Sequence, residues 1–160
     1  MVFLLFLGGQ GGQGGPGLII GVSNPAVLLA FTQIPVGDNS SFSNASLQLS
    51  TSNVQITSVA SDPNKGVVFM AMSDKIYMIF NYNISESKFC TSMTEVFTGK
   101  SSALGQIAVD YISNNLYWCD SLHQWIAMKP AYNSTNDIYK VLVHKDLRQP
   151  VGLALDPKEK

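Results

Sequence analysis

The sequence has few charged residues and few cysteines, and each shortage excludes a class of protein. Only 13% of its 160 residues are charged, and ten Lys and Arg are balanced by eleven Asp and Glu. Such a chain offers no basic field to a nucleic acid. Two cysteines are too few for a small fold built on disulfides. Since 46% of the residues are hydrophobic, we expect a globular domain held together by apolar packing.

Long apolar segments are also missing. Residues 1–7 are apolar but lack a basic start and run into a glycine-rich stretch. Residues 18–31 are interrupted by glycine, asparagine and proline. Neither stretch reaches the roughly 18 to 20 apolar residues that span a bilayer, so no transmembrane helix is expected. Residues 1–24 are predicted to be a poorly ordered, Gly-rich leader, either a degenerate signal or a true secretory one.

Four acceptor sequons for N-glycosylation lie in polar stretches between the apolar runs. They begin at Asn39, Asn44, Asn83 and Asn133. Glycans are attached at such triplets in surface loops of secreted proteins, so the pattern favours an extracellular chain. A sequence rich in Ser and Asn also produces these triplets by chance.

From residue 25 onward the apolar residues come in short runs rich in Val, Ile, Phe and Tyr. Clusters of Asn, Ser, Asp, Gly and Pro separate these runs. This alternation of short apolar runs and polar clusters is typical of strands joined by turns. No apolar stripe at helical spacing extends over three turns, so the sequence predicts an all-β fold.

The predicted strands repeat. Three of them end in aspartates, Asp62, Asp110 and Asp156, which are 48 and 46 residues apart. After the first two aspartates a second strand follows at the same offset, at residues 67–72 and 115–120. A third and a fourth strand can be found in each unit. Four strands in about 45 residues are typical of one propeller blade.

The most specific pattern covers residues 104–157. It contains Gly105-Gln-Ile-Ala-Val-Asp110, then Asn115-Leu-Tyr-Trp-Cys-Asp120, then Asp146-Leu-Arg-Gln-Pro-Val-Gly-Leu-Ala-Leu-Asp156. These motifs resemble the class B (YWTD) repeat of low-density-lipoprotein receptors. The resemblance implies an all-β, partial six-bladed YWTD β-propeller with about two four-stranded blades and flanking strands.

The resemblance divides the chain into parts. After the leader come the opening strands (25–55), a divergent blade (56–103), a YWTD-type blade (104–149) and the first strand of a next blade (150–160). Because this family closes its ring with six blades, we expect the chain to be a fragment with exposed edges.

The resemblance implies that the motif residues hold the blades together rather than perform chemistry. These residues are Asp110, Tyr117, Trp118, Cys119, Asp120, Pro150, Gly152 and Asp156. Side chains of a strand alternate between its faces, so Trp118 and Cys119 point to opposite sides. Both faces carry bulky groups, which suits a strand covered by a neighbour on each side. Each terminal aspartate is expected to accept hydrogen bonds from backbone N–H groups of a turn.

Two departures from the family pattern stand out. Cys119 replaces a threonine, and we expect a free, buried thiol there. A disulfide between Cys119 and Cys90 is the alternative. In the earlier unit Phe69-Met-Ala-Met72 lacks both the Trp and the Asp of the motif. Any hydrogen bond that the Asp supplies is therefore missing there.

Catalytic constellations are hard to find. The only histidines, His123 and His144, are not part of a recognisable nucleophile motif. No group of His, Cys or carboxylates has metal-ligand spacing. We therefore expect no enzyme activity, cofactor or metal. The receptor resemblance makes a pH-sensing role conceivable for either histidine, and ordinary turn histidines are the simpler interpretation.

The resemblance implies a non-enzymatic extracellular segment of a low-density-lipoprotein-receptor-related protein, of the endocytic or Wnt co-receptor type. It would bind a protein ligand on the propeller surface, with the turns 61–65 and 121–124 as candidate contacts. The parent protein would be anchored in the plasma membrane outside this segment, next to further blades and EGF-like modules. The alternatives are a secreted matrix glycoprotein of nidogen type, an EGF-precursor-like propeller, and a calcium-dependent lactonase-type propeller enzyme.

Overall fold

The computed structural model describes the backbone of four N-terminal strands and most of the chain after residue 54. The described ranges are 2–7, 17–22, 26–31 and 44–50 for the backbone, and 55–80, 92–100, 102–135 and 138–156 with side chains. Within these ranges the chain consists of strands and turns. They contain no helix that is long and apolar enough to cross a membrane.

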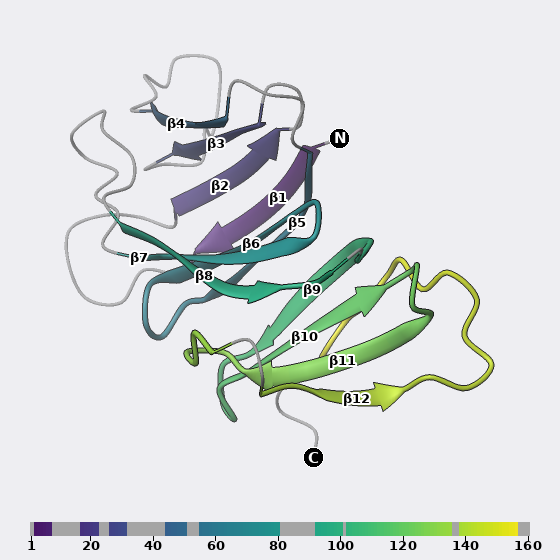
Figure 1. The fold of residues 1–160 in the computed structure, drawn as a ribbon. Coiled ribbons are helices and arrows are strands. Elements are labelled where there is room, and N and C mark those ends of the chain that lie inside the picture. Colours follow the sequence, from purple (N-terminus) through teal and green to yellow (C-terminus); the bar gives the residue numbers. More distant parts are fainter. Residues whose placement is uncertain are drawn as a thin grey trace.

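Twelve strands form three four-stranded antiparallel sheets, each made of consecutive strands (Figure 1). The first sheet contains β1 (Val2–Leu7), β2 (Gly17–Val22), β3 (Ala26–Phe31) and β4 (Asn44–Ser50). The second contains β5 (Ile56–Asp62), β6 (Val67–Met72), β7 (Lys75–Phe80) and β8 (Ser92–Thr98). The third contains β9 (Leu104–Asp110), β10 (Asn115–Asp120), β11 (Trp125–Pro130) and β12 (Lys140–Val143). The predicted all-β fold with propeller-like blades is thus confirmed.

The first sheet includes residues that the sequence predicted to be a poorly ordered leader. β1 and β2 pair in antiparallel register, with Val2 opposite Val22 and Leu7 opposite Gly17. Both strands are rich in Val, Ile, Leu and Phe, which suit a pleated surface. A run of six apolar residues does not by itself show whether it is a strand or part of a leader, because only the strand with which it pairs decides between the two. The structure therefore has three sheets where about two blades with flanking strands were predicted.

The sheets follow one another like blades. β5, the first strand of the second sheet, contacts β1 on one side and β9 on the other, so the first strands lie next to one another (Figure 1). The fourth strands β4, β8 and β12 form the opposite edges of their sheets. This arrangement lets each sheet cover a face of the next.

The core lies between the second and third sheets. All six residues of β6 are buried, so both faces of this strand are covered. On β10 Leu116 and Trp118 are buried, and the Trp118 ring lies 4.6 Å from that of Phe97. Burial of one large apolar side chain of this kind stabilises the folded state by about 1.5–3 kcal/mol.

A repeated hydrogen bond ties each first strand to the unit before it. The Ile107 N–H donates to Ser58 Oγ over 3.0 Å, and the Leu153 N–H donates to Gln106 Oε1 over 3.0 Å. Ser58 and Gln106 each stand four residues before a repeat aspartate, and Ile107 and Leu153 each stand three before one. Residues 150–156 therefore dock on the third sheet as β9 docks on the second.

Gly105 allows this docking to be close. A Cβ atom at position 105 would lie 3.3 Å from the Val151 carbonyl oxygen, which is tighter than ordinary van der Waals contact. The Gln106 N–H donates to the same oxygen over 3.2 Å. The segment that was predicted to begin the next blade thus lies where such a strand belongs.

Candidate ligand-binding surface

The turns of the second and third sheets gather at two opposite ends. At one end the turns 63–66 and 111–114 meet, since the Lys65 ammonium donates to Asn114 Oδ1. At the other end the turn 121–124 meets the link between β8 and β9, since the Ser121 N–H donates to the Ala103 oxygen over 3.0 Å. We call the first the Tyr132 end and the second the Leu122 end, after the residues described below.

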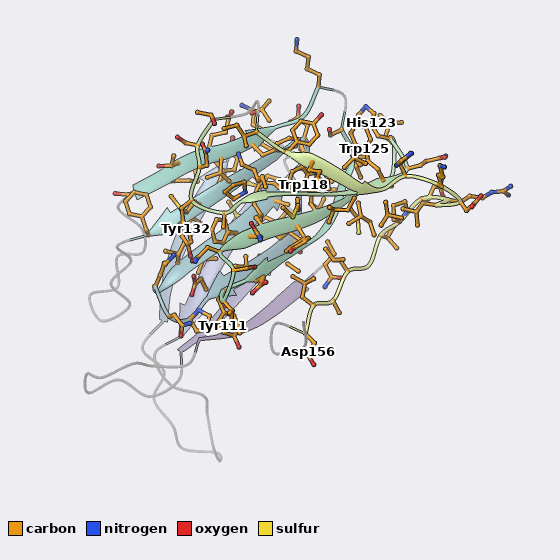
Figure 2. The ribbon with its side chains drawn as sticks, turned by 90° about the horizontal axis from the view of Figure 1, so that it is seen from below. Tyr111, Trp118, His123, Trp125, Tyr132 and Asp156 are labelled. Atoms are coloured by element: carbon orange, nitrogen blue, oxygen red, sulfur yellow. The ribbon has the colours of Figure 1, made fainter. Side chains whose placement is uncertain are left out.

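This geometry separates two turns that the sequence analysis offered together. The turn 61–65 joins the first and second strands of its sheet and lies at the Tyr132 end, whereas the turn 121–124 joins the second and third strands. Successive connections of an antiparallel sheet alternate between its ends, so the two turns cannot belong to one end surface. Figure 2 shows His123 and Trp125 together, away from Tyr111 and Tyr132.

Three of these turns share one construction. Asp120 Oδ1 accepts the N–H groups of Leu122 and His123, both over 3.0 Å. Asp110 Oδ1 accepts those of Ile112 and Ser113, over 2.9 and 3.1 Å. Asp62 Oδ1 accepts those of Asn64 and Lys65, over 2.9 and 3.2 Å. The predicted role of Asp110 and Asp120 as acceptors for a turn is confirmed.

The fourth residue after each aspartate has a positive φ. The values are 60° at Gly66, 59° at Asn114 and 59° at Gln124. Gly and Asn adopt this left-handed conformation at little cost, whereas Gln does not. Asp156 is exposed, and the residues that would form its turn lie outside the described part of the chain.

Asp120 is almost completely enclosed, with 1% of its surface exposed. Burial acts to raise its pKa, but hydrogen bonds from His123, Ser102 and Ala103 together outweigh it and hold the pKa below its ordinary value. His123 Nδ1 lies 2.8 Å from Asp120 Oδ2. The carboxylate therefore ties the turn and its histidine to the link from the previous sheet.

The other motif residues support packing. Cys119 is free and buried, its Sγ lies 3.5 Å from the Gly152 oxygen, and burial raises the pKa of its thiol. Cys90 lies outside the described residues. Tyr117 and Pro150 are half-buried, and Gly152 is exposed.

Of the four sequons, one is described with its side chains. Asn133 Oδ1 accepts hydrogen bonds from the N–H of Thr135 over 2.9 Å and from its hydroxyl over 2.6 Å. Asn44 is the first residue of β4, where only the backbone is described, and Asn39 and Asn83 lie outside the described residues.

The Tyr132 end contains contacts that sequence reasoning missed. The Tyr132 hydroxyl donates to Asp62 Oδ2, and burial together with this carboxylate raises the pKa of the phenol. The Lys65 ammonium lies 3.6 Å from the centre of the Tyr132 ring. Lys129, which is fully buried, donates to the carbonyl oxygens of Val96 and Thr135, and burial lowers its pKa. These groups join the second and third sheets.

The Leu122 end contains a pocket of about 350 Å³ between the outer strands of the two sheets. It is lined by Phe97, Thr98, Gly99, Lys100, Ser102, His123, Trp125 and Tyr139. The His123 and Trp125 side chains lie together (Figure 2), with their rings stacked 4.7 Å apart and 14° from parallel. The Tyr139 ring lies 6.4 Å from that of Trp125. Among the residues that the structure describes, the buried Nε1 of Trp125 has no hydrogen-bond partner. Sequence analysis singled out the turn 121–124 but neither Trp125 nor Tyr139.

Metal-ligating groups do not gather in the part of the chain that the structure describes. There, no three His, Cys, Asp or Glu side chains lie close enough together to hold an ion. His144 is exposed and distant in sequence from the His123 turn.

Comparisons with known proteins support the fold. No protein-family model and no curated protein matches this chain. A solved structure described as a nidogen/laminin complex is similar to 98% of the chain, with 17% sequence identity and a TM-score of 0.61. The chain spans half the length of that structure. The likeness shows the fold, a partial β-propeller.

Proposed function

We propose that this chain is a non-enzymatic, extracellular part of a YWTD-type propeller, and that a protein ligand binds at its Leu122 end. One observation carries the proposal: Leu122, 59% exposed, directly precedes His123, which lines the aromatic pocket at one end of the stacked sheets. Exposed apolar groups next to a pocket are typical of protein recognition. The similar structure is described as a nidogen/laminin complex, which is consistent with a protein partner.

The absence of catalysis is part of the proposal. The turn carboxylates already accept hydrogen bonds from their own turns. These hydrogen bonds hold the pKa of Asp110 and of Asp120 below the ordinary value, which makes each carboxylate a weaker base. The contrasting candidate is a calcium-dependent lactonase-type propeller. Hydrolysis of a lactone by the purified chain, dependent on calcium, would contradict the proposal.

We propose a low-density-lipoprotein-receptor-related parent of the endocytic or Wnt co-receptor type, because residues 104–157 resemble that family's motifs. A secreted matrix protein of nidogen type is the alternative within the same binding class. The plasma-membrane anchor and the EGF-like modules of a receptor would lie outside these residues. Binding to laminin would favour the nidogen type over the receptor type.

The experiment uses a matched pair of exposed apolar residues. Leu122 and Ile112 are 59% and 52% exposed, and each lies in a four-residue turn, but at opposite ends. The secreted chain is tested by surface plasmon resonance against purified extracellular proteins, laminin among them. Leu122→Asp should weaken binding at least about tenfold, as loss of a central interface residue does, and Ile112→Asp should not. Binding to none of the proteins, or equal loss in both variants, contradicts the proposal.

A further inference from the structure

The outer strand of the third sheet has an open edge. β12 pairs with β11 along one side, and within the described part of the chain no strand pairs with its other side (Figure 1). Backbone N–H and C=O groups of successive residues point to alternate sides of a strand, so about half of those of β12 face away from β11. An edge of this kind can pair with an extended segment of another chain.

Two apolar side chains of this strand are exposed. Leu142 and Val143 are 41% and 43% exposed, and Val143 lies opposite Ile126. Ile126 directly follows Trp125, which lines the pocket, so β12 ends at the Leu122 end. A strand that lies along β12 therefore reaches the surface to which we assign the protein ligand.

The charge of this segment differs from that of the rest of the chain. Residues 140–148 contain Lys140, Lys145 and Arg148 against a single carboxylate, Asp146, and all four are exposed. The whole chain has ten Lys and Arg and eleven Asp and Glu, which leaves seven basic and ten acidic residues elsewhere. The local excess of positive charge favours a partner segment that is acidic.

The outer strand of the second sheet differs, although its place in the sheet is equivalent. β8 also forms an edge, but it carries an acidic residue, Glu95, which is paired with Lys75 over 2.7 Å. Only one of the seven β8 residues is exposed, whereas three of the four β12 residues are. The combination of an open edge, exposed apolar groups and positive charge therefore belongs to β12.

We infer that an extended, acidic segment of the protein ligand pairs with β12 as an added strand. Its backbone hydrogen-bonds to the open edge, its carboxylates meet Lys140 and Lys145, and its apolar side chains pack on Leu142 and Val143. The inference rests on the proposed function, since it names the part of the partner that binds next to the Leu122 end.

Other occupants of this edge fit less well. A second copy of the chain would pair β12 with itself and bring like charges together, which destabilises a strand pair. A sulfated polysaccharide would match the positive charge, but it has neither the backbone groups that extend a sheet nor apolar side chains.

The first test uses an acetylated, amidated peptide that alternates glutamate and valine. It is titrated into the ¹⁵N-labelled full-length chain. The backbone amide resonances of β12 should move, and those of β8 should stay in place, so β8 serves as an internal reference. A counterpart that alternates lysine and valine should move neither set.

Methylation of the peptide backbone tests the strand pairing itself. One form of the acidic peptide carries methyl groups on the valine nitrogens, and another carries them on the glutamate nitrogens. Because alternate N–H groups point to opposite sides of a strand, one form should bind about tenfold more weakly and the other as well as the parent peptide. A purely ionic contact would leave both forms equally strong.

A charge reversal identifies the contact on the protein. Lys140→Glu should weaken the acidic peptide about three- to tenfold and strengthen its lysine counterpart. Lys65→Glu, at an exposed lysine of the Tyr132 end, is the matched control and should change neither affinity.

The outcomes separate this inference from the proposed function. Unmoved β12 resonances, equal affinity of both methylated forms, or a larger β12 shift with a sulfated oligosaccharide overturns the inference. If whole proteins still bind and Leu122→Asp still weakens them, the proposed function stands without it. If the acidic peptide pairs with β12 as expected but no extracellular protein binds, the inference about the edge stands and the proposed function falls.

Discussion

The second and third sheets have the same strand order, yet they close the turn between their second and third strands differently. In the third sheet Asp120 starts a four-residue turn before Trp125. In the second sheet Met72 pairs with Lys75 across a two-residue turn, in which Ser73 has a φ of 54°. A two-residue hairpin leaves fewer N–H groups facing inward, so it needs no carboxylate. The motif aspartate is thus required by the length of its turn.

The difference in turn length also decides which residues lie beside the pocket. The longer turn carries Leu122 and His123, and His123 stacks on Trp125 at the pocket. The shorter turn has no room for such residues, and its Asp74 oxygen accepts the N–H of Gly99 over 2.8 Å. The proposed binding surface at this end is therefore lined by the third sheet, by the end of β8 and by the link that follows β8.

The largest expected effect comes from the core residue that distinguishes the sheets. Trp118 of β10 corresponds in the repeat to Met70 of β6, and both are fully buried. Trp118→Ala should lower the free energy of unfolding by about 3–5 kcal/mol, because it leaves a cavity beside Phe97. Trp118→Met, which makes the third sheet like the second, should cost less. Urea unfolding measures both, and equal losses would show that the cavity is not the cause.

The next effect concerns the turn carboxylates. Asp120→Ala should cost about 2–3 kcal/mol, because it removes a buried carboxylate and leaves the partly buried N–H groups of Leu122 and His123 without their acceptor. Asp110→Ala should cost less, about 1 kcal/mol, since its turn is exposed and water replaces the carboxylate. The same urea series compares the two. A cost at Asp110 equal to that at Asp120 would contradict the role of burial.

The same carboxylates predict how stability depends on pH. Hydrogen bonds from Ser113 and Ile112 outweigh burial and hold the pKa of Asp110 below its ordinary 3.8, and the pKa of Asp120 is also lowered. Their contribution is therefore present above pH 3.8 and is lost as the pH falls through the lower folded-state values. Asp120→Asn should flatten this loss in urea midpoints measured across the acidic range.

A smaller effect on the free energy of unfolding is expected when either of the two repeated hydrogen bonds, at Ser58 or at Gln106, is removed. Ser58 is buried, so Ser58→Ala should cost about 1–2 kcal/mol by leaving the Ile107 N–H unpaired. Gln106 is exposed, and Gln106→Ala should cost no more than about 0.5 kcal/mol, because water can reach the Leu153 N–H. Thermal unfolding compares the pair. The reverse order would show that residues 150–156 dock more tightly than β9 does.

The last prediction concerns the position with positive φ that the three aspartate turns share. Gln124→Gly should raise the free energy of unfolding by about 1 kcal/mol, because glycine adopts the positive φ without strain. Gly66→Ala should lower it by a similar amount, about 1 kcal/mol, since a Cβ there meets nothing within 4 Å and only the backbone opposes it. Urea midpoints of the two variants should therefore move in opposite directions.

Much of the fold could be predicted because its signals are local. The alternation of short apolar runs, the 48- and 46-residue spacing of aspartates and the turn residues around them predicted the strands of the second and third sheets. The hydrogen bonds of Asp110 and Asp120 span two or three residues, so a motif contains both partners. A leader was predicted over β1 and β2 because their pairing joins runs that carry no repeat signature.

The sequence by itself determined the blade type, the turn chemistry and the position of the candidate turn 121–124. Only the tertiary structure decided which ends the turns occupy, that Lys129 and Tyr132 join the sheets, and that an aromatic pocket forms beside His123. The Tyr132 hydroxyl and Asp62 are 70 residues apart, and Lys129 and Val96 are 33 apart. Contacts at such separations depend on how the sheets stack, and strand periodicity carries no information about that.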